Sequence, residues 1–112
     1  MTKEEAQEEI AAEFLVAHEA RKIGNDGKVR VCARRAAGIA IRYWLQHHPR
    51  SNYGRDSLNQ LRAANRDQGV PQGVRSAARR LVARVTDQFI SQHTSDPIED
   101  SKILINYFLE SP

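Results

Sequence analysis

Residues 28–48 constrain the fold more than any other part of the sequence. They include no proline and only one interior glycine, Gly38, so nothing interrupts a helix along them. Small apolar residues alternate with larger ones, the small ones being Ala33, Ala36, Ala37 and Ala40. Because small side chains let neighbouring helices approach closely, we predict a central helix, the longest of the chain, that packs on more than one side. Pro49 marks its end.

A first helix is predicted close to the N-terminus. Thr2 and Glu5 have the spacing of a capping box, in which each side chain accepts a hydrogen bond from the other residue's backbone N–H. The apolar residues that follow recur at helical spacing, and glutamates occupy the other face. We expect this helix to reach about Ile23 and to stop at Gly24.

Two more helices are predicted after the polar linker of residues 49–56. Ser57 and Gln60 repeat the capping-box spacing and indicate a short helix, which residues 68–71 break. Pro71 suits the first turn of the next helix. The clearest helical period of the chain follows, with apolar side chains at Val74, Ala78, Leu81, Val85 and Phe89.

The last helix is predicted from Asp96 as N-cap and Pro97 at the first helical position. Its apolar residues are Ile98, Ile105, Phe108 and Leu109. No segment alternates between apolar and polar residues with a period of two, so no strand is predicted. The 112 residues suffice for one hydrophobic core. We therefore predict a single all-α domain over residues 1–112, an up-and-down antiparallel bundle of four main helices plus a short extra one.

The sequence argues against a membrane protein and against a secreted one. Arginine and lysine interrupt every apolar run, so no stretch has the roughly 20 apolar residues of a membrane span, and we expect no membrane association. The first residues contain no apolar segment of the signal-peptide kind, and the single cysteine, Cys32, has no partner in the chain. A cytoplasmic location is expected.

The basic residues are concentrated in the middle of the chain. Residues 1–26 carry three basic and seven acidic side chains, whereas residues 93–112 carry one basic and four acidic side chains. Residues 27–92 carry thirteen basic and three acidic side chains, a formal charge of +10. This distribution indicates a basic surface flanked by acidic ends.

Several of these arginines are spaced so that like charges stack along a helix. Arg75 and Arg79 are four residues apart, as are Arg80 and Arg84, and such pairs cost stability. Two explanations remain open: glutamates of the first helix pair with the arginines inside the bundle, or an anionic partner such as nucleic acid binds them. In the second case the candidate anion-binding residues are Arg34, Arg35, Arg75, Arg79, Arg80 and Arg84.

The sequence gives little indication of a metal site or a cofactor, and we expect neither. His47 and His48 are adjacent, so they cannot both face one ion from the same side of a helix. Cys32 lies among apolar residues and is expected to be buried. Residues 24–28 place glycines before a helix, but Val29 stands where a phosphate-binding loop needs Ser or Thr, so an ordinary turn is expected.

The predicted central helix resembles the signature helix of HEPN domains. In that family small and apolar residues surround a polar pair, and an alanine-rich run leads into a leucine or tryptophan, as residues 29–45 do here. Leu58 and Leu61 resemble the segment that follows, although Asp56 stands where the family usually has a histidine. The similarity covers nearly the whole chain, including the helices predicted after residues 70–71 and 96–97.

The resemblance implies a bundle that forms a homodimer and takes part in RNA or nucleotide biochemistry, including toxin–antitoxin pairs and nucleotidyltransferase partners. It also implies a candidate catalytic pair, because active HEPN ribonucleases carry an arginine and a histidine separated by four to six residues. Arg42 and His47 fit that spacing. Such a pair cuts RNA without a metal, the histidine moving the proton and the arginine stabilising the phosphorane.

Residues five apart on one helix point about 140° from each other. A site made from Arg42 and His47 therefore requires two pairs that meet across a dimer, or a helix that ends between them. From these observations we expect a binding or accessory module that acts with nucleic acid, a nucleotide or a protein partner such as a nucleotidyltransferase. The alternative is a metal-independent endoribonuclease that uses Arg42 and His47 across a dimer.

Overall fold

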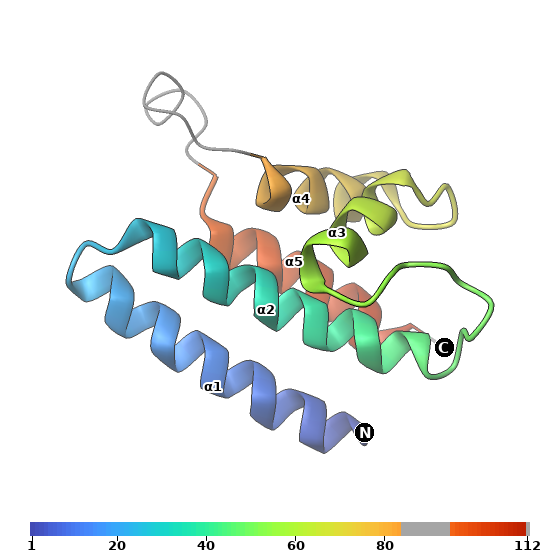
Figure 1. The fold of residues 1–112 in the computed structure, drawn as a ribbon, viewed down its shortest axis with the longest axis horizontal. Coiled ribbons are helices and arrows are strands. Elements are labelled where there is room, and N and C mark those ends of the chain that lie inside the picture. The colour runs from blue at the N-terminus through green and yellow to red at the C-terminus, as the bar shows by residue number, and fades with distance from the viewer. Residues whose placement is uncertain (84–94, 112) are drawn as a thin grey trace.

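The computed structural model describes residues 1–83 and 95–111, and over these residues it consists of five α-helices and no strand (Figure 1). The helices are α1 (Lys3–Lys22), α2 (Asp26–Leu45), α3 (Ser57–Arg66), α4 (Gln72–Val82) and α5 (Pro97–Glu110). Along the chain α1, α2, α4 and α5 alternate in direction, and the short α3 lies between α2 and α4. The predicted all-α bundle with one short extra helix is confirmed.

Helix α2 is the centre of the bundle and lies against α1, α5 and α3. Its four small residues Ala33, Ala36, Ala37 and Ala40 have no exposed surface, as expected for a helix packed on several sides. The prediction that it is the longest helix is wrong, since α1 and α2 both have 20 residues. Helix α2 ends at Leu45 because turns formed by the N–H groups of His47 and His48 replace the helical pattern ahead of Pro49.

Gly38, in the second half of α2, marks a place where α3 approaches closely. A Cβ atom at Gly38 would lie 2.9 Å from the Cβ of Ser57, the first residue of α3, and closer still to its hydroxyl oxygen. Only a residue without a side chain fits there, so Gly38 sets the distance between the two helices.

The predicted helix starts are confirmed at both ends of the chain. The Thr2 hydroxyl accepts from the Glu5 N–H at 3.1 Å, and the Glu5 carboxylate accepts from the Thr2 N–H at 2.9 Å. Asp96 caps α5 by accepting from the Ile98 N–H at 2.9 Å, and Pro97 follows at the first helical position.

The predicted cap of the short helix is wrong by one residue. Asp56, not Ser57, is the N-cap of α3, and its carboxylate accepts from the Asn59 N–H at 2.8 Å. Ser57 is instead held against Gly38, and the buried side chain of Gln60 donates to carbonyl oxygens of the preceding loop rather than closing a capping box.

Helix α4 is shorter than the ladder of apolar residues predicts. It ends at Val82, followed by Ala83 in an extended conformation, whereas Val85 and Phe89 lie outside the described residues. Arg30 and Arg34 of α2 donate to the carbonyl oxygens of the last turn, which in a longer helix would accept from later backbone N–H groups. Side chains of α2 thus supply hydrogen-bond donors to the last turn of α4.

Helices α1 and α5 run in opposite directions and are joined by an ion pair near each end. Lys3 Nζ lies 2.9 Å from a Glu110 carboxylate oxygen, and Arg21 Nη2 lies 2.6 Å from Asp96 Oδ1. Burial raises the pKa of Asp96, but the bonds from Arg21 and from the Ile98 N–H outweigh it, so the net shift is downward. These pairs link the beginning of each helix to the end of the other.

The core includes most of the predicted apolar residues of α3, α4 and α5; Leu58 is partly buried, and Val85 and Phe89 lie outside the described residues. Leu81 and Phe108 are fully buried, and Cys32 is buried as expected. Burial raises the pKa of the Cys32 thiol, so it is unreactive in the native fold. Across the residues that the structure describes, none of the helices is both long and apolar enough to span a lipid bilayer.

Candidate functional site

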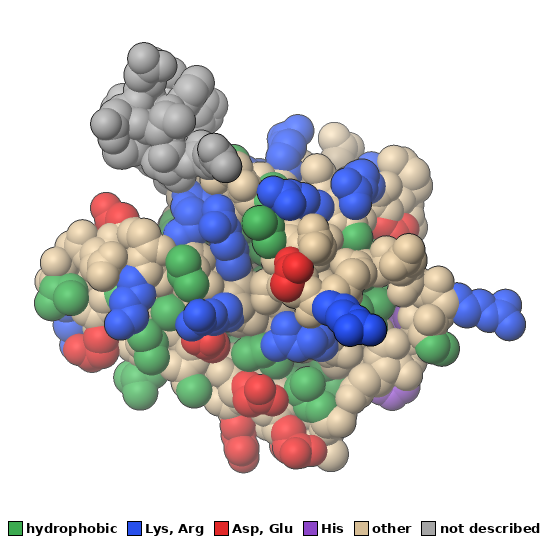
Figure 2. Space-filling view, in the orientation of Figure 1, with side chains coloured by type: hydrophobic (Ala, Val, Ile, Leu, Met, Phe, Trp, Pro, Cys, Tyr) green, Lys and Arg blue, Asp and Glu red, His purple; other side chains and the backbone are tan. Residues whose placement is uncertain are grey.

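Acidic and basic side chains occupy different parts of the surface. In Figure 2 the Lys and Arg side chains lie mainly over α2, α3 and α4, whereas most acidic side chains lie toward the edge formed by α1. On the face shown, the basic middle of the sequence is thus separate from the acidic edge.

Among the described residues, no glutamate of α1 forms an ion pair with an arginine of α2, α3 or α4. The glutamates in question are Glu8, Glu9, Glu13 and Glu19. Among the described ion pairs only Glu19 takes part, with Lys22 of its own helix at 3.2 Å. The reason is topological: α2 lies between α1 and α4, so the glutamates of α1 cannot reach the arginines of α4.

Arg80 is the one arginine of α4 with a buried counter-ion. Its Nη2 and Nε lie 2.9 and 3.0 Å from Asp100 Oδ1 of α5. The Asp100 side chain is only 6% exposed, and its Oδ2 atom is buried without a described hydrogen-bond donor. Arg80 therefore joins α4 to α5, and its charge is largely neutralised inside the fold.

The other arginines of the predicted α4 stripe are not gathered into one site. Arg75 is half-buried and donates to Gln68 Oε1 at 3.3 Å, whereas Arg79 is exposed. Arg80 faces α5, and Arg84 lies outside the described residues. Of the three described members, Arg79 alone is exposed and free for a ligand.

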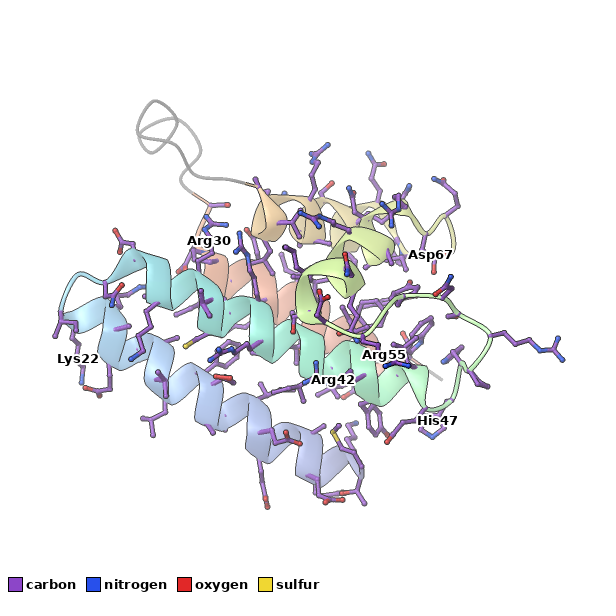
Figure 3. All side chains as sticks on the ribbon, in the orientation of Figure 1. Lys22, Arg30, Arg42, His47, Arg55 and Asp67 are labelled. Carbon is purple, nitrogen blue, oxygen red and sulfur yellow. The ribbon has the colours of Figure 1, made fainter. Side chains whose placement is uncertain are left out.

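Arg30 and Arg34 of α2 lie against the end of α4, and the charge of Arg62 on α3 acts on Arg34. Arg30 Nη1 donates to the Arg80 and Leu81 carbonyl oxygens at 3.0 and 3.3 Å, and Arg34 Nε donates to the Leu81 carbonyl oxygen at 2.6 Å. Figure 3 labels Arg30 beside the end of α4. Burial lowers the pKa of Arg34, and the nearby charges of Arg30 and Arg62 lower it further. We call Arg30, Arg34 and Arg62 the arginine cluster.

Sequence reasoning identified only part of this cluster. Arg34 was a candidate, but Arg30 and Arg62 were not among the predicted site residues, although Arg30 precedes Arg34 by one helical turn and could have been found from that spacing. Arg62 comes from a different helix, and no local pattern links it to the other two. Arg35, a further candidate, is exposed on α2.

Arg42 lies within α2, whereas His47 lies beyond its end (Figure 3). The Arg42 guanidinium folds back toward Gly38, since its Nη1 would be 3.3 Å from a Cβ placed there. His47 is exposed beyond the end of the helix at Leu45, and its ring packs edge-on against Tyr43 with centroids 5.6 Å apart. About 10 Å of helix axis separates Gly38 from Leu45, so one chain does not bring the two groups together.

Two other sequence features have simple structural roles. The turn of residues 24–28 is an interhelical connection in which Gly24 has φ +75° and Asn25 caps α2 by accepting from the Lys28 N–H at 3.1 Å. Within residues 1–83 and 95–111, no three His, Cys, Asp or Glu side chains gather in a way that could hold a metal ion.

Comparison with known proteins adds no relative: no protein-family model matches the chain, and neither a curated protein nor a solved structure shows significant similarity to it.

Proposed function

We propose that this chain is a nucleic-acid-binding module whose interface is the basic surface of α2, α3 and α4. One observation carries the proposal. Of the twelve described Lys and Arg side chains between residues 27 and 83, Arg80 alone forms an ion pair with a described carboxylate. A folded domain whose described residues supply so few counter-ions to these cations has a surface suited to a polyanion.

The exposure of these side chains supports the same proposal. Those classed as exposed are Lys28, Arg35, Arg50, Arg55, Arg62, Arg66 and Arg79. Arginine predominates, and its planar guanidinium can donate two parallel hydrogen bonds to one phosphate. All but Arg50 and Arg55, which lie in the loop before α3, are carried by helices, which hold them in fixed positions.

The test is equilibrium binding of a fluorescently labelled single-stranded RNA, followed by anisotropy over a range of salt concentrations. Each phosphate contact on a single strand contributes about −0.7 to the slope of log K against log salt, so four contacts give about −3. The same titration with single-stranded and duplex DNA distinguishes the kinds of nucleic acid.

The matched control exchanges charge on opposite sides of the molecule. Replacing Arg62, Arg66 and Arg79 with glutamine together should weaken binding at least tenfold and flatten the salt slope by about 2. Replacing Glu8 and Glu9 of α1 with glutamine should leave the slope unchanged. Absence of binding to every nucleic acid at low salt would refute the proposal.

A second candidate is the metal-independent ribonuclease suggested by the HEPN resemblance. It is supported by the end of α2 at Leu45, between Arg42 and His47, and by the exposure of His47. Because the two groups diverge within one chain, the activity requires a homodimer in which Arg42 of one copy meets His47 of the other.

Two measurements test this second candidate. Light scattering should give twice the mass of one chain, and protein in excess chelator should cut RNA to leave 2′,3′-cyclic phosphate ends. The substitution His47→Ala should abolish cleavage while His48→Ala preserves it. A monomer, or a His47→Ala variant that cuts as fast as the parent, contradicts the ribonuclease candidate.

A further inference from the structure

Helix α1 exposes apolar side chains on the face that points away from the bundle. Its inner face packs against α2 through buried residues such as Ile10. Leu15, five residues later, points about 140° away from Ile10, and 65% of its surface is exposed. In Figure 1 α1 lies at the edge of the bundle, on the far side of α2 from α4, and no described helix covers its outer face.

The outer face of α1 carries a stripe of residues whose spacing alternates between three and four. Every member is exposed, and the members are Glu4, Glu8, Ala11, Leu15, His18 and Lys22. A stripe with this spacing runs along one side of a helix and can pack along the whole length of a second helix. It begins with two glutamates, has apolar side chains in the middle, and ends with a histidine and a lysine.

The middle of this stripe is complementary to a second copy of itself. In an antiparallel pair centred beside residue 13, Leu15 of one copy lies between Ala11 and Ala12 of the other. A two-fold axis through the centre produces the same contact a second time. The alanines are small enough for the helices to approach closely, so both leucines are removed from water.

The charges at the two ends of the stripe favour the same antiparallel pair. In this register Glu8 comes opposite His18 of the second copy, and Glu4 comes opposite Lys22. Lys22 Nζ lies 3.2 Å from Glu19 of its own helix, but the lysine side chain is 71% exposed, so a second carboxylate can reach it. A parallel pair would instead place Glu4 and Glu8 opposite their own copies, and like charges repel.

We propose that the chain forms a symmetric homodimer in which the outer faces of two α1 helices pair antiparallel. Contact between two helices of 20 residues buries less than roughly 1,200 Å² in total, the small end of specific interfaces, so the dimer should dissociate at micromolar concentrations. The proposal does not depend on nucleic-acid binding. Because α4 lies on the other side of α2, the basic surface of each copy stays outside this interface.

This dimer differs from the one that the ribonuclease candidate requires. Arg42 folds back toward Gly38, where α2 packs against Ser57 of α3. In Figure 1 α3 lies on the far side of α2 from α1, so pairing through α1 does not bring Arg42 of one copy to His47 of the other. A substitution on the outer face of α1 therefore distinguishes the two dimers.

The first experiment measures the dissociation constant of the dimer by sedimentation equilibrium over the micromolar range. Leu15→Gln should raise this constant at least about tenfold, and it should leave the fold intact because the leucine is exposed. Val31→Gln is the matched control, since Val31 is 41% exposed but lies on α2, and it should leave the constant unchanged. A parent that stays monomeric, or a dimer that Leu15→Gln does not weaken, overturns the proposal.

The second experiment tests the direction of the pair by exchange of charge. Glu4→Lys and Lys22→Glu should each weaken the dimer several-fold, because each brings like charges together in two equivalent places. The variant that carries both substitutions restores the opposite charges and should recover the parent dissociation constant. Lys102→Glu is the matched control, because Lys102 also pairs with a glutamate three residues earlier but lies on α5. A double variant as weak as the single ones would refute the antiparallel interface.

Discussion

Replacement of Gly38 by alanine tests the packing of α2 against α3. In an exposed helix this change would stabilise the protein by up to about 1 kcal/mol, because alanine has the higher helix propensity and restricts the unfolded chain. Here the new methyl group would lie 2.9 Å from the Cβ of Ser57, well inside the normal contact distance. Ser57 is the first residue of α3, where the Asp56 cap holds the backbone, so its Cβ cannot turn away.

Overpacking of this kind costs about 1–3 kcal/mol, and the larger figure applies because the helix itself must shift. After subtraction of the propensity gain, we expect Gly38→Ala to lower the free energy of unfolding by about 2 kcal/mol, or the midpoint by about 8 °C. Thermal and urea unfolding followed by circular dichroism measure both values.

Two further variants make the reasoning falsifiable. Gly73→Ala, in α4, adds a methyl group with no atom within 4 Å and should stabilise the fold by about 0.5 kcal/mol. Ser57→Gly removes the two atoms nearest to a methyl group at Gly38 and leaves the flexible Arg42 guanidinium at 3.3 Å, so Gly38→Ala should be much less costly in that background. A Gly38→Ala protein as stable as the parent would refute the close approach of α3.

The remaining predictions concern three buried groups. Asp100→Ala should cost about 2 kcal/mol because Arg80 loses its counter-ion, with urea unfolding as the measurement; a loss below about 0.5 kcal/mol would contradict the buried pair. Burial and a hydrogen bond to Asp67 raise the pKa of Tyr53, so this tyrosine favours the fold below about pH 10 and that contribution is lost as the pH rises further. Tyr53→Phe should therefore leave the absorbance change at 295 nm between about pH 8 and 11 the same as in the parent, and a smaller change would refute the burial. Cys32 should react with a thiol reagent roughly a hundredfold more slowly in the native protein than in urea, and equal rates would contradict its burial.

Local sequence signals were sufficient for most of the fold. The Thr2 capping box and the Asp96 and Pro97 start of α5 depend on residues within one helical turn of each other, and each occurs as predicted. The burial of α2 on several sides follows from its alanines, because their small side chains let neighbouring helices pack closely against it.

Interactions between distant residues account for the errors. The last turn of α4, which ends at Val82, is bonded to Arg30 and Arg34, about fifty residues earlier, and the period of the apolar residues gives no sign of this contact. Asp100, which neutralises Arg80, is on a different helix twenty residues later, and no local pattern links the two residues.

The sequence predicted that the candidate site is basic, but not which arginines lie near one another in it. The excess of arginine in the middle of the chain indicated a basic surface, whereas the grouping of Arg34 with Arg62 depends on how α3 packs across α2. For the same reason the spacing of Arg42 and His47 could not show that the arginine turns back toward the start of its helix.

The ion pair between Lys3 and Glu110 places the beginning of α1 beside the end of α5. A short flexible linker could therefore join the two ends, and the chain could be reopened within residues 49–56 to give a circular permutant with the same helices. Contacts between α1 and α5 would then be local in sequence, while those between α2 and α3 would become the most distant. Such a permutant should keep the native structure but fold at a different rate, because the cost of loop closure depends on the order of the helices along the chain.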